Sequence, residues 1–182
     1  MDRFYYDLLN IGKNKIDEKE YINILDKIIK EETDYIKIDN PTLDRVCKIV
    51  STNINDRLKK ENIDSKIINT KNIYDMYEHE FVLSSFIDLD NNVTYYLIDP
   101  TYSQFMDKGE YNFKVIYPPD ILKKDEEGKI LLNNLLKYGY SKVDNNDIKR
   151  YIGSLLYEED INKIDVNISD LYLERSKRWK QY

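Results

Sequence analysis

Cysteine, histidine, glycine and proline are all scarce in this chain of 182 residues, which contains one Cys, one His, five Gly and four Pro. A single cysteine cannot form a disulfide within the chain, and one histidine with one cysteine does not make a zinc ligand cluster. The sequence also lacks a P-loop, a GxGxxG turn, a CxxC pair and an HExxH helix. We therefore expect no metal site and no cofactor.

The sequence has no apolar run of about 18 residues and no signal peptide. We expect a cytoplasmic protein that does not enter a membrane, although a secretion route that needs no signal stays open. The formal net charge of −6 argues against nucleic-acid binding, which needs a surplus of Lys and Arg. The last residues are basic, as expected of a solvated helix end or of a docking site: Arg175, Lys177, Arg178 and Lys180.

Cys47 falls in a segment with apolar residues at helical spacing. Asn40 is a suitable N-cap and Pro41 a suitable first residue, although the regular helix can also begin nearer Asp44 or Arg45. The predicted inner side of this helix contains Leu43, Val46, Cys47, Val50, Ile54 and Leu58. A cysteine there is either a small buried hydrophobic residue or a nucleophile, and a nucleophile prefers the first helical turn.

The one histidine opens a predicted strand, 79–87, which a polar turn at 90–92 joins to a second predicted strand, 93–99. In the register that this turn favours, His79 and Asp99 lie at the same end of the hairpin and on the same face. A histidine at a strand end is often structural, and an aspartate before a proline is often a turn residue. Placed together, the two side chains also have the positions of a catalytic pair.

The other predicted elements are helices at 4–11, 17–29, 130–138, 147–159 and 169–180, and strands at 63–70 and 113–117. We expect Asp125 to Gly128 to form an exposed acidic loop, and Ser169 to cap the last helix. The helix at 130–138 is expected to bury Leu131, Leu132, Leu135 and Leu136.

A thiol, an imidazole and a carboxylate can share nucleophilic catalysis. Cys47 would attack a carbonyl carbon, His79 would transfer the proton, and Asp99 would orient the imidazole. The developing oxyanion needs hydrogen-bond donors, for which the Cys47 backbone N–H is one candidate and the side chain of Asn40 or Gln104 the second. Tyr102 and Gln104 are also expected to line the cleft, although Tyr102 equally fits an ordinary aromatic loop.

Three segments, VCKIVSTNINDRLKKENIDSKII, EHEFVL and YYLIDPTYSQF, resemble the transglutaminase-like branch of the papain-like fold in their chain order of Cys, His and Asp. That branch includes transglutaminases, arylamine N-acetyltransferases and bacterial transglutaminase-like proteases. The resemblance implies an α+β fold with a nucleophile helix on an antiparallel sheet, Cys47 as nucleophile, His79 as general base and acid, and Asp99 as its orienter. The chain lacks the Gly or Trp that often lies beside the family's cysteine.

We therefore predict one transglutaminase-like domain over 1–182, with a helical N-terminal extension at 1–40, the catalytic helix and sheet at 41–117, and a helical C-terminal cap at 118–182. The predicted function is cysteine-dependent acyl transfer through a thioester, as in a protease, an amidase or deamidase, or a transglutaminase-type enzyme. The substrate would be a peptide, a protein, or a small amide or amine. Two alternatives stay open: an inactive binding module of the same fold, and an N-acyltransferase that uses acyl-coenzyme A.

Overall fold

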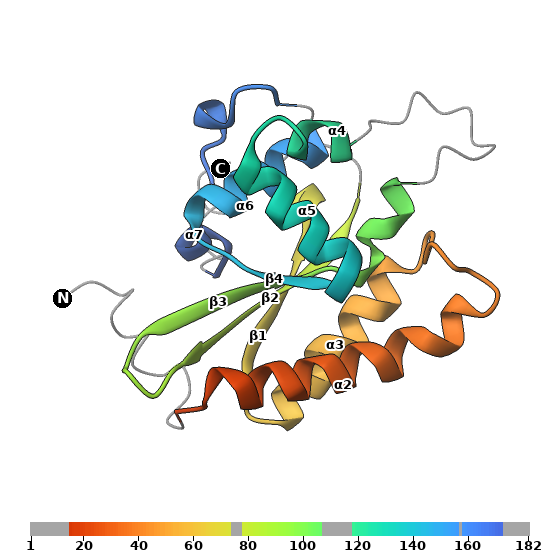
Figure 1. Ribbon diagram of the computed structural model, residues 1–182, viewed down its shortest axis with the longest axis vertical. Helices are drawn as coiled ribbons and strands as arrows, with labels where there is room; N and C mark the ends of the chain where they lie inside the picture. Colours follow the sequence, from red (N-terminus) through yellow and green to blue (C-terminus); the bar gives the residue numbers. More distant parts are fainter. Residues whose placement is uncertain (1–14, 74–77, 107–117, 157, 173–182) are drawn as a thin grey trace, which may run out of the picture.

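The protein is an α+β structure in which helices cover both faces of one antiparallel sheet (Figure 1). The computed structural model describes residues 15–73, 78–106, 118–156 and 158–172. The sheet has the strand order β1-β2-β3-β4, with β1 at Asp64–Asn69, β2 at Glu80–Ile87, β3 at Val93–Ile98 and β4 at Tyr140–Lys142. The α+β class predicted from the sequence is confirmed.

The helices form two layers, one below and one above the sheet in Figure 1. The lower layer contains α2 (Glu18–Lys37) and α3 (Cys47–Lys60). The upper layer contains α4 (Pro118–Leu122), α5 (Glu126–Tyr138), α6 (Asn145–Leu156) and α7 (Ile168–Tyr172). Three short 3-10 helices connect these elements: η1 (Thr70–Asn72), η2 (Pro100–Phe105) and η3 (Ile161–Lys163).

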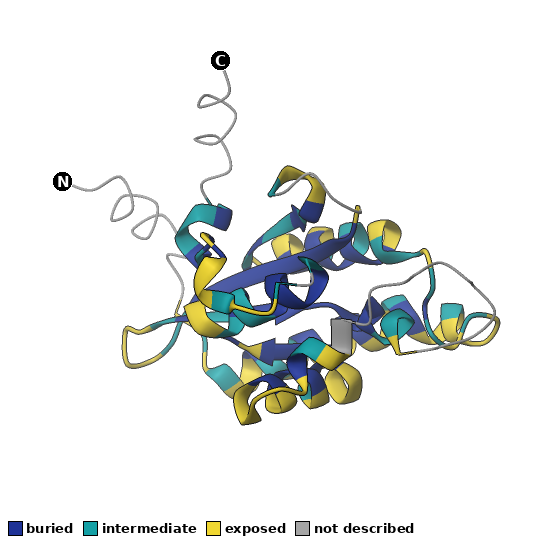
Figure 2. Ribbon diagram, turned by 90° about the horizontal axis from the view of Figure 1, so that it is seen from above, coloured by how far each residue is buried: buried dark blue, intermediate teal, exposed yellow. Residues whose placement is uncertain are grey.

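Each face of the sheet has its own hydrophobic core, because successive strand residues point to opposite faces. The core on the α2 and α3 side includes Tyr21, Leu25, Ile28, Val50, Ile54, Val82, Phe86 and Tyr96. The core on the side of α4 to α7 includes Phe81, Leu83, Leu97, Leu131, Leu135, Ile148, Tyr151 and Ile152. Figure 2 shows the strands as the buried middle layer, with the exposed residues on the outer sides of the helices.

The β2–β3 hairpin has the register that the sequence predicted. Val82 lies opposite Ile98 and Ile87 opposite Val93. Asp88 fixes the turn, since its carboxylate accepts hydrogen bonds from the backbone N–H groups of two turn residues, Asp90 and Asn92, at 2.9 and 2.8 Å. The residues that follow β3 and precede β2 are therefore brought to one end of the hairpin.

Helix α2 is attached to the sheet by tyrosine hydroxyl groups as well as by apolar contacts. Tyr21 is fully buried and donates a hydrogen bond of 2.9 Å to Ser84 Oγ on β2. Tyr96 on β3 donates to Glu18 at 2.7 Å, and Tyr140 on β4 donates to Asp26 at 2.7 Å. These bonds keep the aromatic rings between helix and sheet while satisfying their polar ends.

Several predictions for the C-terminal third were wrong in detail. Glu126 to Gly128 do not belong to an exposed loop but form the first turn of α5. Asp125 is exposed as predicted and caps this helix, since its carboxylate accepts a hydrogen bond of 2.6 Å from the Gly128 N–H. Leu136 is 38% exposed rather than buried. Helix α7 begins before Ser169, and its capping bond comes from Asn167, whose side chain accepts the Asp170 N–H at 3.0 Å.

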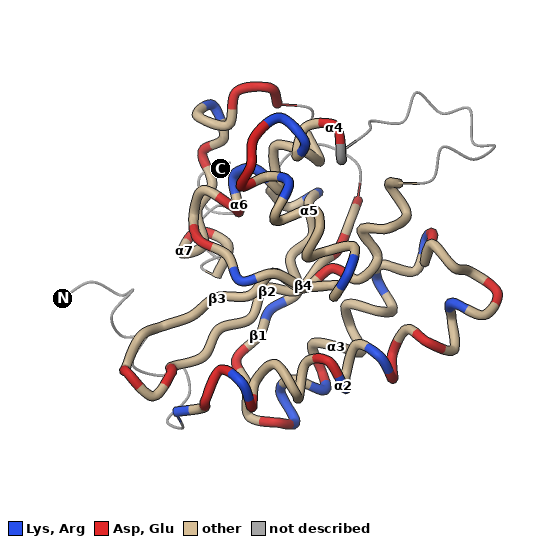
Figure 3. Tube along the Cα trace, viewed as in Figure 1, with Lys and Arg blue, Asp and Glu red and all other residues tan. Residues whose placement is uncertain are grey.

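Strand β4 was not predicted, and it brings three residues of the segment that was expected to form a helical cap, Tyr140–Lys142, into the sheet. The predicted helix at 4–11, the predicted strand at 113–117, and most of the predicted helix at 169–180 with its four basic residues lie outside the described residues. Charged residues of both signs occur along the outer helices and turns (Figure 3). In the described part of the chain, no helix is long and apolar enough to cross a membrane.

Candidate active site

Cys47 is the first residue of α3, so this helix begins later than Pro41 and close to the alternative start near Asp44 or Arg45. The residues before it form turns because the Asn40 side chain bonds to the backbone of Asp44. Asn40 accepts the Asp44 N–H at 3.0 Å and donates to its carbonyl at 2.9 Å. At the first helical position Cys47 benefits from N–H groups that have no acceptor within the helix and from the positive end of the helix dipole. Both favour a thiolate.

The loop before Cys47 has an unusual backbone conformation. Leu43 and Arg45 have φ angles of 56° and 61°, in the left-handed region that costs a residue with a side chain about 1–2 kcal/mol. Contacts from η2 and from the core maintain this conformation. Leu43 is fully buried, Ser103 Oγ donates to the Thr42 carbonyl at 2.8 Å, and the Arg45 N–H donates to Gln104 Oε1 at 3.4 Å. The loop is thus fixed by the residues that follow Asp99.

His79 lies directly before β2 and pairs with Asp99, which lies directly after β3. Nε2 of His79 is 2.8 Å from Oδ2 of Asp99, and the two residues are 5% and 1% exposed. The His79 backbone is held by Thr70, whose hydroxyl accepts its N–H at 2.9 Å. The imidazole ring also packs edge-on against Phe105, with ring centroids 5.1 Å apart. The predicted proximity of His79 and Asp99 is present.

Cys47 meets His79 at the end of the sheet and not across one of its faces. Helix α3 packs on the face that contains Val82, whereas Phe81, on the same predicted face as His79, belongs to the opposite core. The helix that carries the cysteine therefore packs on the face of the sheet opposite to Phe81. The thiol reaches His79 because it is on the first residue of α3, beside the start of β2. Cys47 is partly exposed there.

The electrostatics of the site favour a charged pair. Burial lowers the pKa of His79, but the charge and hydrogen bond of Asp99, followed by those of Cys47, raise it to about 10. Burial raises the pKa of Cys47, but the hydrogen bond and charge of His79, with a hydrogen bond from the Glu80 backbone, bring it below the ordinary value. Since Nε2 is bonded to Asp99, Nδ1 is the imidazole nitrogen left for the thiol.

Two further side chains bind the Asp99 carboxylate, and sequence reasoning missed both. Thr101 Oγ1 donates to Oδ1 at 2.7 Å, and Tyr151 Oη on α6 donates to Oδ2 at 2.6 Å. With His79, these donors compensate the cost of burying a charge. Tyr151 lies on the apolar side of a helix that was predicted, and a phenol on such a side needs a polar partner. The sequence therefore indicated that the Tyr151 hydroxyl has a buried polar partner, but it did not identify Asp99 as that partner.

The remaining predicted site residues have different outcomes. The Asn40 amide is engaged by the Asp44 backbone, so Asn40 stabilises the loop rather than serving as the second oxyanion donor. Tyr102 is fully buried with its hydroxyl 3.0 Å from Ser154 Oγ, so the prediction that it lines the cleft is wrong. Gln104 is different, because its Nε2 is buried without a hydrogen-bond partner.

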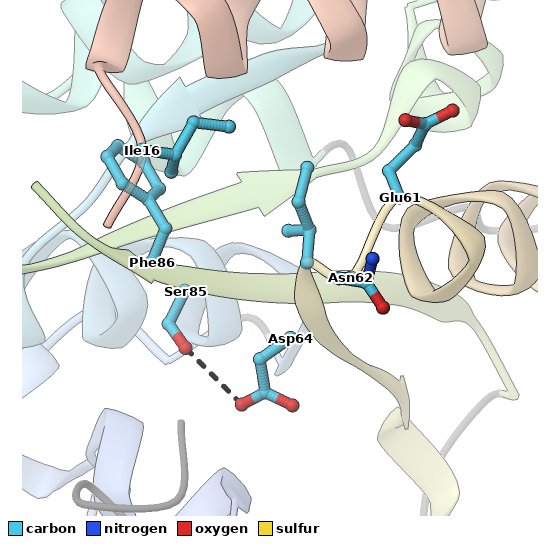
Figure 4. Close-up of a pocket in the computed structure, with 7 residues that line it drawn as sticks. Ile16, Glu61, Asn62, Asp64, Ser85 and Phe86 are labelled. Carbon is cyan, nitrogen blue, oxygen red and sulfur yellow. Dashed lines mark hydrogen bonds between the residues drawn. The ribbon is translucent and has the colours of Figure 1, made fainter. Parts of the chain in front are cut away.

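A separate pocket lies at the opposite end of β2, about 20 Å from His79 by strand length (Figure 4). Its lining residues are Ile16, Glu61, Asn62, Ile63, Asp64, Ser85 and Phe86. The polar contact drawn there is between Ser85 Oγ and Asp64, at 3.5 Å. The pocket has no part in the chemistry of Cys47. Among the described residues, no group of three or more His, Cys, Asp or Glu side chains is placed to hold a metal ion.

A partly exposed thiol, a buried imidazole and a buried carboxylate thus meet where α3, β2 and β3 come together. Nε2 of the His79 imidazole is bonded to the Asp99 carboxylate, and the Cys47 thiol also hydrogen-bonds to this imidazole. This is the arrangement of a thiol nucleophile with a proton acceptor and an orienting group. Comparisons of the chain with protein-family models, curated proteins and solved structures found no match.

Proposed function

We propose that this protein is a cysteine-dependent acyl-transfer enzyme in which Cys47 is the nucleophile, His79 the general base and acid, and Asp99 the orienting group. The observation that carries the proposal is the buried His79–Asp99 pair, with 2.8 Å between Nε2 and Oδ2, beside a cysteine at the first position of a helix. A cysteine with no catalytic role has no need of an imidazole whose protonated form is stabilised next to it.

In the resting enzyme Cys47 is a thiolate and His79 an imidazolium. The raised pKa of His79 and the lowered pKa of Cys47 support this state at neutral pH. A thiolate attacks a carbonyl without prior proton transfer, and an imidazolium beside it is ready to protonate the leaving group.

In the acylation step, the sulfur of Cys47 forms a bond to the carbonyl carbon, and the carbonyl π electrons move to the oxygen. When this intermediate collapses, the carbon–nitrogen bond breaks and the leaving amine takes the proton of His79. Neutral His79 then removes a proton from water or from an acceptor amine, which attacks the thioester. The carbon–sulfur bond breaks, Cys47 leaves as the thiolate, and His79 is again an imidazolium.

The oxyanion would be bound by two donors: the backbone N–H of Cys47 and the side-chain amide of Gln104. The Cys47 N–H is in the first turn of α3, where N–H groups have no acceptor within the helix. Gln104 is oriented by the backbone N–H of Arg45, which requires its oxygen on that side and leaves Nε2 as the free end of the amide. A buried donor without a partner is costly unless a ligand or a reacting group uses it.

The order of these parts in the chain supports a transglutaminase-like version of the papain-like fold. The cysteine begins a helix, the histidine precedes the second strand, and the aspartate follows the third strand. The helix packs on the antiparallel sheet that these strands form. The natural substrates of such a site are carboxamides, in a peptide bond or a side chain, and the acceptor is water or an amine.

The decisive experiment is trapping of the acyl-enzyme. The chain has one cysteine, so an activated ester such as p-nitrophenyl acetate should add one acetyl group at Cys47, seen by intact-protein mass spectrometry. Hydroxylamine should remove the group, as it does from thioesters. The His79→Gln variant should acylate more slowly, because it lacks the imidazolium that lowers the pKa of Cys47 and keeps the thiol ionised.

Two controls define the result. Cys47→Ser keeps the size of the side chain and should remain unacylated, while the unfolded wild type reports the reaction of an ordinary thiol. Acylation that is no faster in the folded protein than in the unfolded chain would overturn the proposal. Efficient acylation by acetyl-coenzyme A, with no turnover of glutamine-containing peptides, would instead identify an N-acyltransferase.

A further inference from the structure

The Asp99 carboxylate is shared between the candidate active site and helix α6. Its Oδ2 accepts from His79 Nε2 at 2.8 Å and from Tyr151 Oη at 2.6 Å, so two donors bind the same oxygen. Its Oδ1 accepts from Thr101 at 2.7 Å. Asp99 is 1% exposed and Tyr151 is fully buried, so water does not take the place of either donor.

The Tyr151 phenol is fixed in position by its surroundings. Its ring packs edge-on against Phe81, with centroids 4.8 Å apart, and at a tilt against Tyr102, with centroids 5.6 Å apart. The titratable groups that act on His79 are Asp99 and Cys47, and those that act on Tyr151 are Asp99, Tyr102 and Cys47. Burial and the Asp99 charge raise the pKa of Tyr151 well above its ordinary value, so the hydroxyl is always a donor.

We propose that Tyr151 is a positioning residue of the catalytic site, which orients the Asp99 carboxylate toward His79 and limits how strongly that carboxylate attracts the imidazolium proton. Two donors on one oxygen compete, because each reduces the electron density available to the other. The Tyr151 hydrogen bond is therefore stronger when His79 is neutral and weaker when it is charged. Tyr151 thus favours release of the proton from His79.

This effect has a direct consequence for catalysis, which rests on the function proposed above. His79 must give its proton to the leaving amine and accept another from the attacking nucleophile. An imidazolium bound too tightly to Asp99 is a poor acid. Helix α6, predicted as a cap on the domain, would then be part of the apparatus that sets the proton affinity of the general base.

The test is a titration of the one histidine in the chain by long-range ¹H–¹⁵N NMR, in which its ring nitrogens are the only imidazole signals. Removing the phenol oxygen in Tyr151→Phe should raise the pKa of His79 by about half a pH unit, since only the part of this hydrogen bond's strength that differs between the charged and the neutral imidazole enters the pKa. A side chain needed for packing alone would leave the pKa unchanged, because the ring stays. An unchanged or lowered pKa overturns the proposal.

Tyr102→Phe is the matched control. Tyr102 is equally buried and contacts Tyr151, but its hydroxyl is bonded to Ser154 and not to Asp99. It should leave the His79 titration as in the wild type, and an equal shift in both variants overturns the proposal. If Tyr151→Phe does not fold, 3-fluorotyrosine at this position gives a stronger donor of nearly the same size. It should lower the pKa of His79, and a rise would contradict the proposal.

The titration requires no substrate and no turnover, so it separates this inference from the proposed function. A shift in Tyr151→Phe together with an ordinary, slowly reacting Cys47 thiol would support the role of Tyr151 and overturn the enzyme proposal. A reactive Cys47 together with a His79 pKa that is the same in the wild type and Tyr151→Phe would support the enzyme proposal and overturn the role of Tyr151. In an active enzyme, Tyr151→Phe should slow acylation by an amide substrate by at most about threefold through the higher pKa, because acid strength sets part of the rate at which the leaving amine is protonated.

Discussion

Nε2 of His79 and Oδ2 of Asp99 lie 2.8 Å apart at one end of the β2–β3 hairpin, where both residues are at most 5% exposed. In such surroundings a charge is stable only with a partner, so the pair is held together more firmly than an exposed ion pair would be. The imidazolium is favoured as long as the carboxylate remains. The imidazolium in turn lowers the pKa of the Cys47 thiol and so favours the thiolate.

The first prediction concerns Asp99→Asn. The asparagine keeps the size of the side chain and can still accept a hydrogen bond, but it removes the charge that is the leading cause of the raised pKa of His79. We expect the pKa of His79 to fall from about 10 toward its ordinary value of 6.5 or below, because burial alone lowers it. NMR titration of the single imidazole measures this change. An equally high pKa in the asparagine variant would contradict the assignment of Asp99.

The second prediction concerns the reactivity of Cys47. At pH 6 an ordinary thiol with a pKa of about 8.5 is less than about 1% thiolate, whereas the hydrogen bond and charge of His79 lower the pKa of Cys47 and raise its thiolate fraction. Iodoacetamide should therefore label the wild type at pH 6 at least about tenfold faster than His79→Gln, after allowance for the weaker nucleophilicity of a low-pKa thiolate. Lys48→Gln, which removes a charge from the next residue of α3, serves as the control and should label at the wild-type rate. Equal labelling of the wild type and His79→Gln would show that the imidazole does not activate the thiol.

The third prediction links the His79–Asp99 pair to stability. In a Cys47→Ala background the thiol no longer contributes, and the Asp99 charge remains to raise the pKa of His79 in the folded state above that in the unfolded state. The resulting stability is fully present below pH 6.5 and is lost as the pH rises through the folded-state pKa. The free energy of unfolding should therefore decrease from about pH 6.5 upward, by about 1.4 kcal/mol per unit of pKa difference.

Urea denaturation at several pH values measures this dependence, with Cys47→Ala/Asp99→Asn as the control. The control should show a smaller decrease over the same range, since its His79 has no charged partner. Parallel curves for the two proteins would mean that the pair does not contribute to folding.

The sequence predicted the pairing of His79 with Asp99 because hairpin register follows from alternation and from the polar turn at 90–92. It did not predict the start of α3, because the turns before Cys47 depend on contacts made by distant residues. Ser103 and Gln104 fix that loop from η2, far along the chain. Local preferences at Asn40 and Pro41 pointed to a helix, and tertiary contacts overrode them.

The difference between local preferences and tertiary contacts also explains what could be predicted of the helices and the strand at 118–172. Helix α6 was predicted from its apolar spacing, but which polar group would receive the Tyr151 hydroxyl depends on how α6 packs over the sheet. Strand β4 is three residues long, too short for an alternation pattern to be visible in the sequence. It forms because β3 offers an unpaired edge next to the end of α5.

The fourth prediction separates oxyanion binding from thiol activation. Gln104→Leu keeps the approximate volume of the side chain and removes the Nε2 donor, so acylation by an ester should slow by about 10²–10³-fold, the usual cost of losing an oxyanion donor. Labelling of Cys47 by iodoacetamide involves no oxyanion and should change little. Gln104→Glu provides a second measurement, since it keeps the acceptor for the Arg45 N–H and loses the donor. If both variants acylate at the wild-type rate, Gln104 is not part of the oxyanion hole.

The last prediction tests how Asp99 is placed. Gly139 connects α5 to β4 with a φ of 80°, its carbonyl accepts the Asp99 N–H at 2.8 Å, and a Cβ added to it would lie 2.9 Å from Cβ of Pro100. Gly139→Ala should therefore reduce the free energy of unfolding by about 1–3 kcal/mol through backbone strain and crowding. It should also slow labelling of Cys47, because the shift of Pro100 moves the neighbouring carboxylate away from His79. Gly153→Ala on α6 is the matched control, since its Cβ would meet the Glu158 carbonyl at an ordinary 3.5 Å and alanine favours helix. That variant should be at least as stable as the wild type and keep its thiol reactivity, whereas equal losses in both would mean that the Gly139 contact with Pro100 does not position Asp99.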